Sequence, residues 1–206
     1  MITVGFDPGK TNFAYAIVDG ERRTLVQTGM IQNVIKTLNG GGSKKKADNF
    51  KHSVNLFKKE IRGILKKYAG LTSRDLVVFE RMQVRPGRGH APVEVTNLMV
   101  GLAVSVASEV TGSMLVTAST WKRHVKTNVY HKLVGNCRFC RSRKCVINLR
   151  NKRFCKNWKN DRVFRDGLAK YNGIDIKTNH EADAVCLACY GISTAYNKDV
   201  FLKLRT

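Results

Sequence analysis

Residues 2–19 read ITVGFDPGKTNFAYAIVD, and the pattern of these residues is the main indication of the fold. Apolar side chains alternate with smaller ones from Ile2 to Phe6, and Asp7-Pro8-Gly9 then breaks the pattern. The alternation and the break predict a strand that ends at Asp7. Phe13 to Asp19 and Arg23 to Gln32 continue as two further strands, so the chain is expected to open with a β-meander.

The residues that follow this opening predict a connector, a helix and a buried strand. Asn39 to Lys46 is rich in glycine and lysine and predicts a flexible connector. Apolar residues recur at steps of three and four from Ala47 to Ile64, which predicts an amphipathic helix that ends near Gly70. The short apolar run Asp75 to Glu80 predicts a buried central strand whose last residue is an acid.

The next segments complete the expected order of elements. Val93 to Val110 is helical in length and apolar on nearly all sides, so we expect the sheet and a further surface, such as a partner subunit, to cover it. Met114 to Thr117 predicts another strand, and His180 to Ala195 predicts a closing helix. Together these elements predict an α/β domain.

The charge balance indicates a polyanionic partner. The 206 residues fit a single domain, 1–206, and the content of 43% hydrophobic and 25% charged residues is typical of a globular protein. However, 37 Lys and Arg residues against 15 Asp and Glu give a net charge of +22, with a pI of about 10.1. Nucleic acid is the natural partner for such a chain, because cations that neutralise phosphates release counterions.

A membrane or secreted location is not expected. No apolar run reaches the ~18 residues that a membrane span needs, so we predict no membrane partner. The chain begins directly with the strand that starts at Ile2, which predicts no signal peptide and an intracellular location.

Three acids stand out in so basic a chain. Asp7 and Glu80 each end a predicted strand, and Asp183 lies within the apolar helix segment Ala182 to Val185. Carboxylates from two adjacent strands and a covering helix can bind two hard cations that hydrolyse a phosphodiester. Taken singly, Asp7 could be a turn cap and Glu80 a salt-bridged edge residue. A buried acid such as Asp183 requires a partner.

The order of these motifs resembles the RuvC family of Holliday-junction resolvases. The resemblance rests on Phe6-Asp7-Pro8-Gly9 followed by Asn12 to Ala16, on the acid that ends the fourth strand, and on the late helix that contains His180-Glu181-Ala182-Asp183-Ala184. It covers residues 1–121 and 160–195. It implies the RNase H-like fold, with a mixed five-stranded sheet flanked by helices, and a homodimer formed through helix 93–110.

The resemblance also implies a metal site. Asp7, Glu80 and Asp183 would be three of its four ligands, for two Mg²⁺ ions or for Mn²⁺ in their place. The fourth family acid lies three residues before the last one, where this chain has His180, and Glu181 is the alternative. Lys122 resembles the family lysine that follows the fifth strand and supports phosphate charge, although it could equally be a general backbone-binding lysine.

A basic cysteine-rich insertion is predicted at about residues 131–158. Cys137, Cys140, Cys145 and Cys155 suit a structural zinc site, with His124 or His131 as replacement ligands and free or oxidised thiols as the alternative. From Lys122 to Arg165 there are fifteen Lys and Arg residues and one acid. By contrast, Cys186 and Cys189 lie on an apolar helix and are expected to be buried packing residues.

These observations predict a magnesium-dependent endodeoxyribonuclease that makes paired symmetric nicks in four-way DNA junctions. The alternatives are an RNase H-like nuclease with another substrate, such as an RNA-DNA hybrid, an R-loop or transposon DNA, and a non-catalytic junction-binding protein. The expected DNA contacts lie in the basic loop 85–90, after the fifth strand and in the insertion. They are Arg85, Arg88, Lys122, Arg123, Arg138, Arg141, Arg143 and Lys144.

Overall fold

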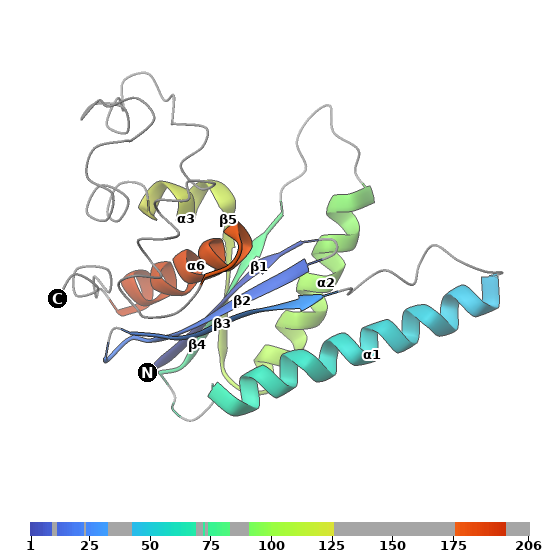
Figure 1. Ribbon diagram of the computed structural model, residues 1–206, viewed down its shortest axis with the longest axis horizontal. Coiled ribbons are helices and arrows are strands. Elements are labelled where there is room, and N and C mark those ends of the chain that lie inside the picture. Colours follow the sequence, from blue (N-terminus) through green and yellow to red (C-terminus); the bar gives the residue numbers. More distant parts are fainter. Residues whose placement is uncertain are drawn as a thin grey trace, which may run out of the picture.

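A mixed five-stranded sheet forms the centre of the protein, which we describe from a computed structural model (Figure 1). The structure describes residues 1–9, 12–22, 24–32, 43–68, 72, 74–82, 91–125 and 176–196. The strands lie in the order β3-β2-β1-β4-β5. Their bounds are β1 Ile2–Pro8, β2 Asn12–Asp19, β3 Thr24–Gln32, β4 Leu76–Arg81 and β5 Gly112–Thr117.

The directions of the strands confirm the predicted opening. β1 pairs antiparallel with β2, and β2 pairs antiparallel with β3, as expected for a β-meander. β4 then pairs parallel with both β1 and β5. The parallel arrangement places the last residues of β1 and β4 at the same edge of the sheet, which we call the Asp7 edge.

Helices cover both faces of the sheet (Figure 1). α1 (Ser43–Tyr68) and α2 (Ala91–Ser108) lie on one face, and α6 (Asn179–Tyr196) lies on the other. α1 begins at Ser43, inside the predicted connector, because the glycines end at Gly42 and the lysines that follow favour a helix. The short helix α3 (Ala118–Val125) was not predicted from the sequence.

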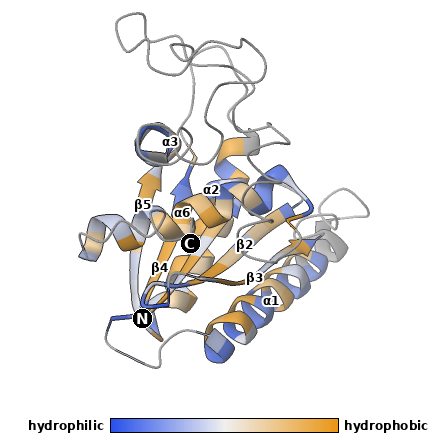
Figure 2. Cartoon of the chain, turned by 60° about the vertical axis from the view of Figure 1, so that its left-hand side comes forward, coloured by the Kyte–Doolittle hydropathy of each residue, from blue (hydrophilic) through white to orange (hydrophobic). Residues whose placement is uncertain are grey.

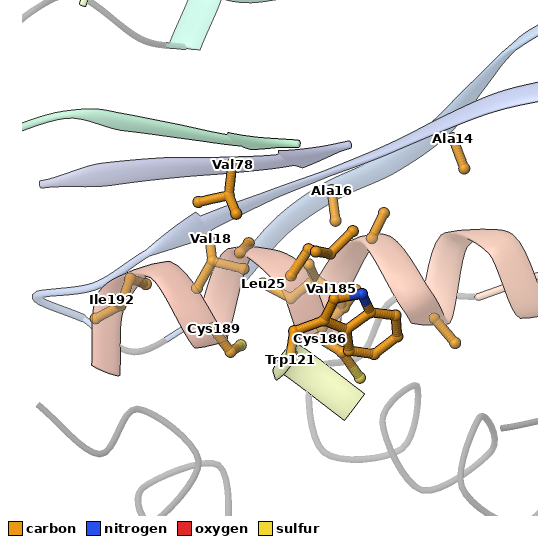
Figure 3. Close-up of a cluster of buried hydrophobic side chains, with 14 of the residues drawn as sticks. Ala14, Ala16, Val18, Leu25, Val78, Trp121, Val185, Cys186, Cys189 and Ile192 are labelled. Atoms are coloured by element: carbon orange, nitrogen blue, oxygen red, sulfur yellow. The ribbon is translucent and has the colours of Figure 1, made fainter. Parts of the chain in front are cut away.

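Two hydrophobic clusters join these layers. Phe6, Phe13 and Phe79 pack with α1 and α2, and the rings of Phe6 and Phe79 stack at 5.1 Å. On the opposite face, Val78 and Trp121 pack with α6 in the second cluster, part of which is shown in Figure 3. The expectation that Cys186 and Cys189 are buried packing residues is confirmed, since both lie in this second cluster.

A glycine allows α6 to approach β1 very closely. A Cβ atom added at Gly5 would lie 2.2 Å from the backbone oxygen of Ala184 and 2.5 Å from the backbone nitrogen of Ala188. Real Cβ atoms are essentially never found at such distances, so any larger residue at position 5 would force the helix away from the sheet. Gly5 therefore determines how close the residues of α6 lie to the end of β1.

A buried carboxylate organises the opposite edge, where β1 and β4 begin. Asp75 accepts hydrogen bonds from the backbone N–H groups of Ile2 (2.8 Å) and Thr72 (3.1 Å) and from the Thr72 hydroxyl (2.9 Å). Its backbone oxygen accepts a hydrogen bond from the Thr111 hydroxyl. Asp75 thus fastens the start of β1 to the turn before β4.

Among the described helices, none combines the length and the apolar character that a membrane span requires.

Candidate active site at one edge of the sheet

Asp7 and Glu80 lie side by side at the Asp7 edge. Phe6 and Phe79 are register partners on the parallel strands β1 and β4, so the residues that follow them emerge at the same level. Both acids are buried, with exposed fractions of 6% for Asp7 and 4% for Glu80. This arrangement is consistent with the prediction that two adjacent strands place two carboxylates close together.

α6 brings His180 and Asp183 to the same edge. His180 Nδ1 lies 2.7 Å from Asp7 Oδ2, and because a carboxylate only accepts hydrogen bonds, Nδ1 carries the proton. Asp183 lies three residues later, on the same side of the helix, and is 7% exposed. The close packing of α6 on Gly5 makes the contact between His180 and Asp7 possible.

α3 supplies two further side chains that contact the acids. The indole N–H of Trp121 donates a 2.7 Å hydrogen bond to Glu80 Oε2, and Trp121 is fully buried. The Lys122 ammonium lies 3.7 Å from Glu80 Oε2 and 3.8 Å from Asp183 Oδ2, so it joins the two carboxylates. It also lies 4.6 Å from the centre of the Trp121 ring, within the range of a cation–π contact.

Glu181, the alternative fourth ligand, has a different role in the structure. Its Oε2 accepts hydrogen bonds from the backbone N–H (2.8 Å) and the hydroxyl (3.1 Å) of Thr178, and the Thr178 hydroxyl accepts one from the Glu181 backbone N–H (3.1 Å). This reciprocal pattern is a capping box, which satisfies N–H groups at the start of α6. Because His180 contacts Asp7 and Glu181 caps the helix, the geometry favours His180 as the fourth residue of the site.

The charge of the site indicates what it can bind. Asp7, Glu80 and Asp183 place three carboxylates in buried surroundings, whereas Lys122 contributes one ammonium group. Within the described part of the chain, no three acidic, histidine or cysteine side chains converge on one point, since the site residues are joined in pairs. Oxygen donors with excess negative charge suit a hard divalent cation, so the chemistry of these side chains is compatible with such an ion.

The buried cysteine nearest to the site is not a candidate nucleophile. Burial raises the pKa of the Cys186 thiol well above its usual value, and the negative charge of Asp183 raises it further. Cys186 therefore stays a neutral thiol that packs in the hydrophobic cluster with Trp121 and Val185 (Figure 3).

Several predicted functional residues lie outside the described ranges. They include the whole cysteine insertion 131–158 with its four candidate zinc ligands, His131, the loop 85–90 with Arg85 and Arg88, and Arg138, Arg141, Arg143 and Lys144. Of the predicted DNA-binding residues, Lys122 and Arg123 are described, and both lie on α3. The ring of His124 packs edge-on against Tyr190 at 5.3 Å.

The sheet order, the flanking helices and the position of the acids define the RNase H-like fold. More particularly, the fold is that of the RuvC resolvases. Thermus thermophilus RuvC in complex with a Holliday junction substrate matches with a TM-score of 0.59 and 13% identity, over 97% of each chain. A second structure of Thermus thermophilus RuvC matches with a TM-score of 0.55 and 14% identity, over 96% of this chain and 97% of that one.

At the level of sequence, no known family model and no curated protein matches the chain. The structural matches confirm the expected RNase H-like fold, although their sequence identity to this chain is only 13–14%.

Proposed function

We propose that the protein is a metal-dependent nuclease that resolves four-way DNA junctions by paired symmetric nicks. The observation that carries the proposal is the gathering of Asp7, Glu80 and Asp183 at one edge of an RNase H-like sheet, with Lys122 between two of them. Each of the three acids is buried, and a buried carboxylate requires a compensating partner, which a divalent cation would supply. The presence of all three acids argues against a protein that only binds DNA.

Asp7, Glu80, His180 and Asp183 would hold two Mg²⁺ ions, with Mn²⁺ as a substitute. Such ions activate a water molecule for in-line attack and stabilise the leaving oxygen of the phosphodiester. Hydrolysis then leaves a 5′-phosphate and a 3′-hydroxyl, the ends that a ligase needs.

The protein side chains have separate tasks in this proposal. His180 holds Asp7 in place through its Nδ1–H, and Trp121 holds Glu80 through its indole N–H. Lys122 can exchange its two carboxylate partners for an oxygen of the scissile phosphate, where an ammonium group stabilises the charge that develops during the reaction. Lys122 is therefore suited to neutralise the acids before the substrate arrives and the phosphate afterwards.

A homodimer through α2 would match the approximate two-fold symmetry of a junction, with one site for each of two opposed strands. The outer side of α2 supports this proposal. Leu98 is 49% exposed and Gly101 follows three residues later with open space around it. Leu115 on the adjacent edge strand β5 is 52% exposed and lies on the same side of the sheet as α2, because its register partner is Phe79.

DNA contacts outside the metal site are proposed from charge and position in the sequence. They comprise Arg85, Arg88, Arg123, Arg138, Arg141, Arg143 and Lys144. A zinc ion on Cys137, Cys140, Cys145 and Cys155 would give the insertion a fixed shape. A protein with this substrate would act inside the cell, where its DNA is.

The function can be tested with purified protein and Mg²⁺ on three substrates, namely an immobile four-way junction, the matching linear duplex and an RNA-DNA hybrid. We expect paired nicks at symmetric positions in the junction, and none with the Asp7→Asn variant. Cleavage of the RNA-DNA hybrid instead would be compatible with the proposed metal site but would contradict the proposed junction substrate. Tight binding without cleavage in either Mg²⁺ or Mn²⁺ would contradict the nuclease proposal.

A further inference from the structure

Helix α1 is longer than the sheet that it covers. From residue 48 on, where burial is described, the first buried residue of α1 is Phe57, whose ring packs on Phe13 at 5.0 Å, and Phe13 pairs with Pro8 at the Asp7 edge. The fourteen residues of α1 that precede Phe57 rise by about 21 Å. Figure 1 shows this first half of α1 extending beyond the sheet, past the end of β3. The helix therefore projects beyond the edge where the candidate active site lies.

A basic stripe runs along this helix. From Ser43 to Tyr68, α1 holds nine Lys and Arg residues and two acids. Among the residues of α1 whose side chains the structure describes, five cations fall within a sector of about 100° around the helix axis, at a rotation of ~100° per residue. They are Lys51, Lys58, Lys59, Arg62 and Lys66. Four of them, Lys58, Lys59, Arg62 and Lys66, line a surface groove together with Asn55 and Gly63. Figure 2 shows how hydrophilic α1 is compared with α6.

The spacing of the charges in this stripe does not favour the helix itself. Lys58, Arg62 and Lys66 follow one another at intervals of four residues, and like charges at that spacing destabilise a helix. Arg62 has an ion-pair partner in Glu109, at 3.1 Å, beyond the end of α2. Gly63 lowers helix stability further, although a Cβ atom at this position would meet nothing within 4 Å. The pattern favours the binding of an external anion over a contribution to folding.

A lipid surface is a poorer partner than nucleic acid. A helix that lies on a membrane must insert its apolar face, whereas Phe57, Ile61 and Leu65 on α1 are buried in the core of the protein. Leu56, which is 49% exposed, lies near Lys59 on the helix, but one exposed leucine is far less than the apolar face that such insertion requires. A row of cations about 22 Å long between Lys51 and Lys66 suits a phosphate backbone.

We propose that the basic stripe of α1 binds the phosphate backbone of a duplex DNA arm outside the active site. This inference rests on the proposed function for the identity of the arm. α1 and the catalytic side chains of α6 lie on opposite faces of the sheet, so the stripe holds DNA away from the scissile phosphate. Its task is to add affinity that depends on arm length, without a contribution to the chemical step.

The test compares the wild type with Lys58→Gln/Lys59→Gln/Lys66→Gln, which leaves the Arg62–Glu109 ion pair intact. Binding to a plain duplex and to junctions with long or short arms is measured at several salt concentrations without divalent metal. We expect the slope of log K against log salt to fall by about 2.7 with long arms, if each lysine neutralises one phosphate. With arms too short to reach α1, the wild type and the variant are expected to bind equally.

Two controls separate charge from structure. The triple Lys→Arg variant keeps the cations and should keep the wild-type slope, and Lys67→Gln removes a neighbouring charge that lies about 100° away from Lys66 around the helix. Equal slopes for the wild type and the triple Gln variant would overturn the proposal. The proposal would also be overturned if the triple Gln variant lost binding to anionic vesicles but bound duplex DNA as the wild type does.

Failure of the proposed function is distinguishable from failure of this inference. Binding to duplex is measured without metal, so it stands even if the wild type does not cut junctions in Mg²⁺. Conversely, single-turnover nicking of a short-armed junction at saturating protein is expected to be the same for the wild type and the triple Gln variant. A loss of that nicking would contradict the assignment of the stripe to arm binding.

Discussion

The two edges of the central sheet both hold buried acids, but the acids have different partners. Asp75, where β1 and β4 begin, accepts hydrogen bonds from backbone N–H groups and a threonine hydroxyl. At the Asp7 edge, Asp7 contacts His180 and Glu80 contacts Trp121 and Lys122. Asp75 is 3% exposed and Glu80 is 4% exposed, so burial alone does not separate the two roles.

The chemistry of the partners separates the roles. Backbone N–H groups are fixed in position and keep their protons, so the contacts of Asp75 hold a turn in place. An imidazole and an ammonium group can release a proton or move to another anion, so the acids at the Asp7 edge can take up a cation. Side-chain partners at the Asp7 edge therefore favour a reactive site there, whereas the main-chain donors favour a structural role for Asp75.

The largest expected effect comes from Asp7→Asn. Removal of one ligand charge from the proposed two-metal site should lower the single-turnover rate of junction nicking by at least about 10³-fold, since each ion would contribute several kcal/mol. The free energy of unfolding should change by less than about 1 kcal/mol, because Asn still accepts the hydrogen bond from His180. Rate and stability are measured on the same preparation. A nicking rate within tenfold of the wild type would remove Asp7 from the site.

The same type of change at the other edge should give the opposite result. Asp75→Ala removes three hydrogen bonds to the start of β1 and to Thr72, so we expect the free energy of unfolding in urea to fall by about 2–4 kcal/mol. The protein that remains folded should nick junctions at the wild-type rate per active site. A variant that is stable but inactive would show that the two edges do not differ in the way proposed.

Gly5→Val tests whether the spacing of α6 sets the geometry at the Asp7 edge. The added atoms would collide with the backbone of α6 at Ala184, so both stability and nicking should decrease, with a loss of about 1–3 kcal/mol in unfolding free energy. Gly63→Val on the surface of α1 is the matched control, because a Cβ atom there has open space. Equal effects of the two changes on nicking would exclude a specific role of Gly5.

Trp121→Phe sharpens the comparison by removing one donor to Glu80. Groups that orient metal ligands typically change metal affinity or activity by about 10–100-fold, so we expect a loss in that range with a higher Mg²⁺ requirement. Replacement of Trp121 by a benzothienyl analogue keeps the shape and removes only the N–H group. If that analogue retains full activity at low Mg²⁺, the hydrogen bond to Glu80 has no positioning role.

The smallest effect is expected for Glu181→Gln. Glutamine also forms capping boxes, so the unfolding free energy should change by less than about 0.5 kcal/mol and nicking should remain within twofold of the wild type. His180→Ala, in contrast, should reduce nicking strongly, and both rates are measured in the same assay. A severe defect in Glu181→Gln alone would make Glu181 the fourth ligand.

The sequence was sufficient to predict the strands and the acids near their ends, although β1 and β4 each run one residue beyond the predicted end, to Pro8 and Arg81. Period-two alternation up to Asp7 and the apolar run up to Glu80 are local patterns, and parallel pairing of β1 with β4 brings the two acids to one edge. α3 and the Trp121–Glu80 hydrogen bond could not be predicted, because the two residues are 41 positions apart and the contact has no local pattern.

The capping box is different, since its signal was present in the sequence. Thr178 and Glu181 have the Ser/Thr-x-x-Glu spacing, which marks the start of a helix and could have separated Glu181 from His180 without a structure.

The most direct test of the central claim is a calorimetric titration of Mg²⁺ or Mn²⁺ into metal-free protein, carried out in parallel on wild type, Asp7→Asn and Asp75→Asn. The protein is first incubated with zinc and freed of the excess, so that any metal binding by the cysteines of residues 131–158 does not contribute to the heat. The account predicts two divalent ions per chain for wild type and Asp75→Asn, and weakened or lost binding for Asp7→Asn. Binding that is the same for Asp7→Asn and wild type would contradict the assignment of the metal site to the Asp7 edge.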